Sequence, residues 1–174
     1  MKAKTTLILT LIFFQFAVLK GTSQNILKPK KGYSPQIGAV VSMLEDLKRR
    51  VTNTVQDLTI EETDFLLDEK ANRIGAMILH LAAIETYYQV HSFENRGFTR
   101  AEQKKWGIAV DLTQKTRDSI INKPISYYLN IWNEVRAKTL KLLKTKDDKW
   151  FKSKIKVKGM KMNNHWIWYH VMEH

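Results

Sequence analysis

The feature that most constrains the fold of this chain is the recurrence of apolar residues every three or four positions through three long stretches. Over residues 35–58, 73–89 and 124–143, a helix would gather the apolar side chains on one side and the charged ones on the other. None of these stretches can bury its apolar stripe alone, so they must pack on one another. The sequence also has few candidate strands and no glycine-rich phosphate loop. It therefore predicts an all-α fold.

Local signals mark where several helices begin. Ser34 before Pro35 is typical of an N-cap followed by the first helical residue, and Asn72 can cap the second long stretch. Thr59 and Thr99 are each followed three residues later by a glutamate, which is the spacing of a capping box. Short helical segments are therefore expected after both threonines.

The connections between the helices define the expected topology. Residues 90–98 have the composition of a loop, and residues 150–162 fit either a short hairpin or an extended loop. Asn163 and Asn164 would cap a closing helix. Because residues 90–123 form a long connection, a simple up-and-down order is not expected. The sequence predicts an antiparallel four-helix bundle with a long crossover between the second and third long helices.

The N-terminus has the pattern of a secretory signal peptide. Lys2 and Lys4 precede an apolar run at residues 7–19, and small and polar residues follow as far as Gln24. The run is shorter than the ~20 apolar residues of a membrane span, although an uncleaved anchor is an alternative. We expect export to a periplasm or out of the cell, with a chain divided into a signal peptide (1–24), an exposed leader (25–33) and a helical domain (34–174).

Charge and cysteine content exclude several classes of function. The formal net charge is +12, and the lysines and arginines are spread along the chain rather than gathered in an arginine-rich arm. Nucleic acid is therefore not an expected partner. We expect that the charge mainly keeps the chain soluble, and weak association with an anionic membrane or envelope surface is the alternative. The chain has no cysteine, which excludes disulfides, thiol nucleophiles and thiolate metal sites.

Histidines near the C-terminus suggest a metal site. Three of the five histidines lie in residues 165–174, and His170 and His174 are four apart, so they would share one face of a helix. His80, within the second long stretch, is the best third ligand, and Glu85 could orient it or could be a surface acid. Imidazole ligands suit zinc and nickel first, then iron or manganese. The alternative is that these histidines are ordinary surface or core side chains.

Residues 72–85 and 165–174 resemble the corresponding helices of the DinB-like superfamily of four-helix metalloproteins. In that superfamily, one ligand histidine comes from the second helix and two, spaced four apart, come from the last. His80 matches the first ligand, and His174 matches the opening histidine of a motif that reads His-Glu-x-x-His before Arg-Gly-Gln. The sequence stops at that point, and we expect that the chain is truncated within the motif. The alternatives are a substitute ligand, His170, or loss of the metal site. Members commonly form homodimers.

Two functional hypotheses follow, and the sequence leaves open whether the protein is an enzyme. The first is a metal-dependent hydrolase or transferase that uses a three-histidine site on an unknown small-molecule substrate. The second is an exported, non-catalytic binding or scaffold bundle without a functional metal. In the second case Trp166, Trp168 and Tyr169 would form the partner surface, unless they belong to the core.

Overall fold

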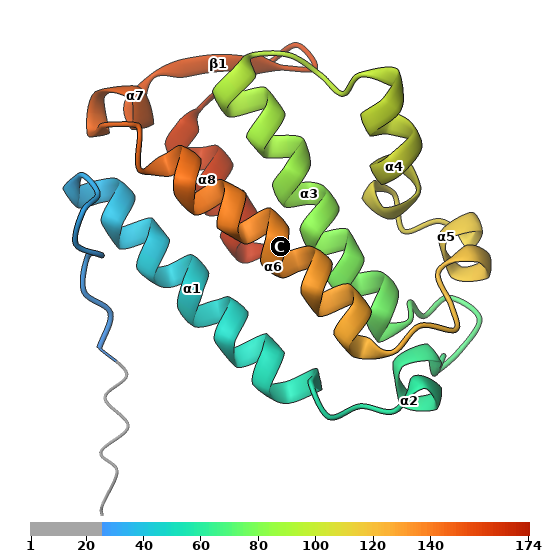
Figure 1. The fold of residues 1–174 in the computed structure, drawn as a ribbon. Coiled ribbons are helices and arrows are strands. Elements are labelled where there is room, and N and C mark those ends of the chain that lie inside the picture. Colours follow the sequence, from blue (N-terminus) through green and yellow to red (C-terminus); the bar gives the residue numbers. More distant parts are fainter. Residues whose placement is uncertain (1–25) are drawn as a thin grey trace, which may run out of the picture.

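The computed structural model describes residues 26–174, and the predicted signal peptide at 1–24 lies outside them. This part of the chain is mostly helical, with one small sheet (Figure 1). No helix within residues 26–174 has the length and apolar content to cross a membrane. The elements are α1 (Pro35–Val55), α2 (Ile60–Asp64), α3 (Ile74–Glu94), α4 (Arg100–Val110), α5 (Gln114–Ser119), α6 (Ile125–Leu143), α7 (Asp148–Lys152), β1 (Lys154–Val157), β2 (Met160–Asn163) and α8 (Asn164–Glu173).

The helix α3 is the centre of the arrangement. It packs along α6, and it also contacts α8 and α4, while α1 contacts both α6 and α8 (Figure 1). Side chains of α3 enter two apolar clusters. One cluster includes Trp106 and Trp132 together with the N-terminal half of α3. The other includes Leu44, Phe151 and Trp168 together with the C-terminal half of α3. The predicted helical fold class is confirmed.

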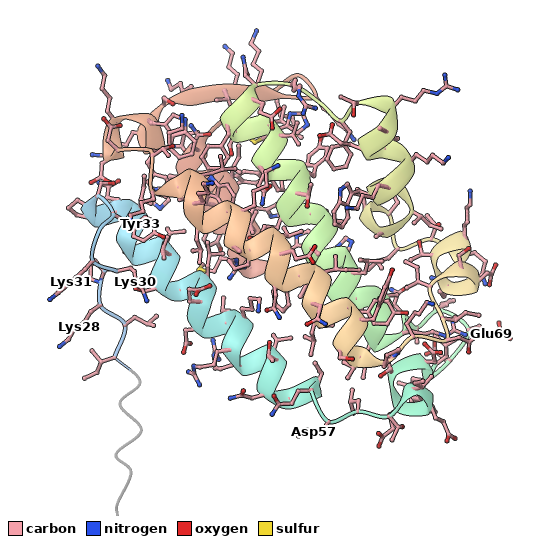
Figure 2. All side chains as sticks on the ribbon, viewed as in Figure 1. Lys28, Lys30, Lys31, Tyr33, Asp57 and Glu69 are labelled. Carbon is pink, nitrogen blue, oxygen red and sulfur yellow. The ribbon has the colours of Figure 1, made fainter. Side chains whose placement is uncertain are left out.

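The residues that precede α1 lie along its first turns. Ile26–Gly32 are exposed, and the side chains of Lys28, Lys30 and Lys31 extend away from the ribbon (Figure 2). The backbone N–H of Lys30 donates to the carbonyl oxygen of Gly38 at 2.9 Å. A Cβ at position 38 would lie 2.9 Å from the oxygen of Lys30, so glycine allows this close approach.

The predicted helix starts were partly right. Both capping boxes are confirmed, since the hydroxyls of Thr59 and Thr99 accept from the backbone N–H three residues later, and the glutamates there bond back. Ser34 does occupy the N-cap position of α1, but its hydroxyl donates to Asp148 of α7 instead of accepting from its own helix. The cap predicted for Asn72 was wrong, because α3 begins at Ile74 without a side-chain cap.

The structure corrects the prediction for one connecting segment and decides between the two alternatives for another. Residues 90–98 are not all loop, because α3 continues to Glu94 before Asn95 ends it in the left-handed conformation (φ 51°). Burial of Val90 against the core outweighs the loop-like composition. Residues 154–163 form the hairpin alternative, with β1 and β2 antiparallel and Gly159 at positive φ (82°) in the turn.

Met77, which belongs to the apolar stripe predicted at residues 73–89, is exposed, and so is Trp166, one of the aromatic residues considered for a partner surface. Met77 of α3 is 41% exposed and Trp166 of α8 is 42% exposed. Periodicity predicts the apolar stripe of a helix, but tertiary packing decides which positions of the stripe are covered.

Candidate metal centre

Two elements that pack against each other carry the three predicted ligands. α3 carries His80, α8 carries His170, and His174 directly follows α8 as its C-cap. The side chain of Asn163 caps α8 by accepting from the backbone N–H of Trp166 at 2.8 Å. The buried face of α8, which includes Trp168, fixes the rotation of this short helix against α1 and α3.

The structure brings His80 and His174 into direct contact. Their Nε2 atoms are 2.9 Å apart and their ring centroids are 4.9 Å apart, although 94 positions separate them in the sequence. As residues, His80 is half-buried and His174 is exposed. The predicted meeting of these two imidazoles across two helices is therefore present.

The backbone of α4 determines which nitrogen of His80 carries the proton. Nδ1 of His80 lies 2.7 Å from the carbonyl oxygen of Ala109, and a carbonyl can only accept, so Nδ1 must be the N–H. Nε2 is then unprotonated in the neutral ring, and its lone pair faces His174. A histidine that binds a metal through one nitrogen usually donates its other N–H to such an acceptor. The contact with Ala109 thus prepares Nε2 of His80 as a ligand.

His170 is next to this pair but is engaged elsewhere. Its ring centroid lies 4.8 Å from that of His174, and its Nδ1 lies 2.8 Å from a carboxylate oxygen of Glu173. The ring also stacks on Trp166 at 4.9 Å. Within residues 26–174, no three histidine or acidic side chains are arranged to hold one ion together. The expected three-histidine set is thus a contacting pair with the third ring beside it.

Electrostatics favours the neutral form of His174. Burial lowers the pKa of its imidazole, and the neighbouring rings of His80 and His170 lower that pKa further, while Glu173 acts in the opposite direction. Imidazole must be neutral to bind a metal. The environment of His174 therefore supports a ligand role near neutral pH.

Both roles considered for Glu85, an acceptor that orients His80 and a surface acid, were wrong. It follows His80 by five residues, which turns it by about 140° around the helix, so it faces α6 instead. Glu85 is 1% exposed, and its carboxylate accepts hydrogen bonds from Arg136 at 2.8 and 2.9 Å and from Trp132 at 3.1 Å. The hydroxyl of Thr139 donates to the same carboxylate. Glu85 is a core residue and not a partner of His80.

Two partners in this region were missed from the sequence. The acceptor for His80 is the backbone carbonyl of Ala109, a group that every residue has, so no sequence pattern could reveal it. Arg136 did have a signal, since it lies four residues after Trp132 and three before Thr139 on the inner face of α6. Trp168, considered for a partner surface, is fully buried.

A small cavity adjoins the histidine pair. It has a volume of about 230 Å³, and His174 forms part of its wall together with apolar side chains of α1, α3 and α8. Trp132 and the cationic Lys48 and Arg136 also line it. A small molecule held here would lie beside the imidazole of His174.

No family model matches the chain, and no curated protein matches it. Function must therefore be inferred from the histidine pair and its surroundings. The pair combines a fixed tautomer, a short separation and an adjoining cavity.

Proposed function

We propose that this chain is a divalent-metal-binding protein of the DinB-like superfamily. In this proposal α1, α3, α6 and α8 form an antiparallel four-helix bundle, and residues 95–124 are the crossover between the second and third long helices. The single observation that supports the metal site best is the 2.9 Å contact between the Nε2 atoms of His80 and His174. The bond from His80 to Ala109 leaves a lone pair on that side of the ring.

Binding of a tetrahedral ion by these residues would require two adjustments. Two nitrogens that each lie 2.0–2.1 Å from zinc are about 3.3 Å apart at the tetrahedral angle, so the pair has to open by a few tenths of an ångström. His170 is the third ligand in this proposal, once its ring leaves Glu173. Three imidazoles suit zinc or nickel best, with iron or manganese as further candidates.

The proposed activity is a hydrolysis or a group transfer on a small molecule. A bound metal would supply a Lewis acid. The residues of the cavity beside His174 would bind the substrate, with Leu81 and Trp132 against its apolar part and Lys48 against an anionic group. Glu173, released by His170, would be available to hold a proton. The resemblance further suggests an exported homodimer. Sedimentation equilibrium would reveal the mass of the dimer.

Metal analysis of the purified full chain tests this proposal. We expect about one zinc or nickel ion per chain, lost in His80→Ala and in His174→Ala, and affinity reduced at least about tenfold in His170→Ala. His165→Ala is the matched control, because this histidine lies on the same helix but stacks on Phe151 at 4.7 Å. Saturating metal should also raise the melting temperature of the wild type and not that of His80→Ala.

The opposite result would favour the second hypothesis. A folded chain that takes up no metal and melts at the same temperature with and without chelator would be a non-catalytic scaffold. Trp166 and Tyr169 of α8, which are 42% and 46% exposed, would then be the first residues to test as a partner surface.

A further inference from the structure

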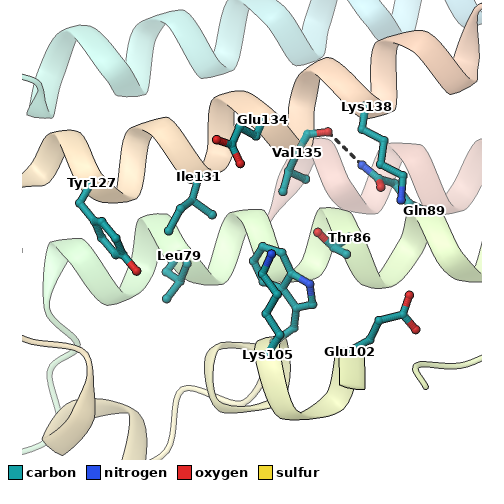
Figure 3. A pocket seen from close by; sticks show the side chains of 11 residues that line it. Leu79, Thr86, Gln89, Glu102, Lys105, Tyr127, Ile131, Glu134, Val135 and Lys138 are labelled. Atoms are coloured by element: carbon teal, nitrogen blue, oxygen red, sulfur yellow. Dashed lines mark hydrogen bonds between the residues drawn. The ribbon is translucent and has the colours of Figure 1, made fainter. Parts of the chain in front are cut away.

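A second cavity lies between α4 and the pair of helices α3 and α6 (Figure 3). Its volume is about 620 Å³, within the range of small-molecule sites. It shares no lining residue with the histidine pair or with the cavity beside His174. Its apolar walls are Leu79 of α3, Trp106 of α4, and Ile131 and Val135 of α6.

One polar side chain at this cavity is almost completely buried. Gln89 is 1% exposed, and its amide nitrogen donates to the carbonyl oxygen of Val135 at 2.9 Å and to the hydroxyl of Thr139 at 2.8 Å (Figure 3). Because the carbonyl only accepts, the amide cannot be turned the other way. Its Oε1 accepts no hydrogen bond from the described residues, although Gln89 lines the cavity. A ligand with an O–H or N–H donor would satisfy this oxygen.

The charges around the cavity favour an anion. Lys105 and Lys138 line it, and neither forms an ion pair within residues 26–174. Glu102 also lines it, but Arg96 bonds to both of its carboxylate oxygens, at 2.6 and 3.0 Å. This pairing lowers the pKa of Glu102 to about 2, and Arg96, which also bonds to Glu94, offsets part of its charge. Glu134 is the remaining acid, so two free ammonium groups face one free carboxylate.

The aromatic wall indicates the shape of the ligand. The indole of Trp106 is 7% exposed, and the ammonium of Lys105 lies 4.8 Å from the ring centroid. A flat ring held in the cavity can contact the exposed part of Trp106 while its acid group reaches Lys105. The formal charge of +12 adds a long-range attraction for anions.

We propose that this cavity binds a small aromatic carboxylate that bears a hydroxyl group. The ring lies against Trp106 and Ile131, the carboxylate pairs with the ammonium groups of Lys105 and Lys138, and the hydroxyl donates to Oε1 of Gln89. This binding needs no metal and does not depend on the histidine pair.

Calorimetric titration of the purified full chain with three matched probes tests the proposal. The first is 3-(4-hydroxyphenyl)propionate, the second is 3-phenylpropionate, which lacks the hydroxyl, and the third is tyramine, which replaces the carboxylate by an ammonium group. We expect the first to bind tightest, the second to bind about five- to tenfold more weakly, and tyramine not to bind detectably.

Matched variants locate the binding site. Lys105→Met and Lys138→Met should each weaken the first probe about threefold to fivefold, whereas Lys104→Met and Lys141→Met, on the same helices but away from the cavity, should leave it unchanged. Ile131→Trp should fill the cavity and abolish binding, with circular dichroism to verify its fold.

Three results would overturn the proposal. Binding that persists in folded Ile131→Trp would place the site elsewhere. Equal losses in Lys104→Met and Lys105→Met would show attraction to surface charge alone. Absence of binding by all three probes, or equal binding of all three, would show that the cavity does not select this class of ligand.

Discussion

At the scale of single residues, the most consequential contact is the buried pair of Glu85 and Arg136. Arg136 is 5% exposed, and besides its two bonds to Glu85 it donates to the carbonyl oxygen of Leu44 in α1. This one side chain therefore connects three helices. Each charge of a buried ion pair has lost its contact with water and is compensated by the other charge. Loss of either partner therefore leaves a buried charge without compensation.

We expect Arg136→Met to lower the free energy of unfolding by about 3–5 kcal/mol, because Glu85 would keep a buried charge without a cation. Urea denaturation measures this loss. Arg49→Met is the control, since Arg49 pairs with Asp46 on the exposed side of α1 and should cost less than about 1 kcal/mol. The double variant Glu85→Leu/Arg136→Met should be more stable than Arg136→Met alone, and equal stability would contradict this account.

His91 gives the protein a predicted sensitivity to acid. It is 8% exposed, with its ring centroid 4.3 Å from that of Tyr87, and burial followed by the charges of Lys158 and Arg96 lowers its pKa. The folded state therefore binds a proton less readily than the unfolded state. Below the ordinary histidine pKa of 6.5 the unfolded chain takes up the proton first, so stability falls as the pH falls.

Denaturation series between about pH 7 and pH 5 measure this dependence. In His91→Gln, stability should fall less steeply with acidification than in the wild type. Some slope should remain, because the pKa of His174 is lowered as well. Identical slopes in the two proteins would rule out His91 as a source of the acid sensitivity.

At the scale of elements, the contact between α3 and α6 depends on a glycine. A Cβ added at Gly75 would overlap the ring of Tyr128, which is 1% exposed. The ring cannot move away without disturbing the surrounding core, because interiors are close-packed. Gly75 is therefore required by the approach of two helices and not by its own backbone conformation.

Gly75→Ala should destabilise the protein by about 1–3 kcal/mol, as overpacking of a core does. Gly107→Ala is the matched control, because a Cβ there meets only the flexible side chain of Gln103, and alanine in the interior of α4 should add up to about 1 kcal/mol. Thermal unfolding of both variants tests the pair. A stable Gly75→Ala would show that α6 can shift away from α3.

The elements also show which structural features local sequence patterns can predict. The capping boxes at Thr59 and Thr99 were predicted correctly because each of them is a contact between residues three positions apart. The loop predicted at 90–98 was partly wrong because the end of α3 depends on burial of Val90, which is a tertiary effect.

At the scale of the whole molecule, two faces of one helix carry different groups. One face of α3 carries His80 toward α8, and another carries Glu85 and Gln89, four residues apart, toward α6, where Gln89 also lines the cavity bordered by α4. The histidine pair and the cavity lined by Gln89 thus lie at separate places on a common helix. The proposed metal uptake and the proposed binding of an aromatic acid can therefore be tested independently in the same preparation.

The amino-acid sequence by itself determined the helical fold class, the positions of the long helices and the histidines worth testing. These depend on periodicity and on contacts within one turn, which a sequence records directly. Only the tertiary structure decided that His80 meets His174, that Glu85 turns away to Arg136, and that Ala109 fixes the His80 tautomer. Such contacts join positions far apart in the chain, and they depend on how each helix is rotated and where it ends against its neighbours.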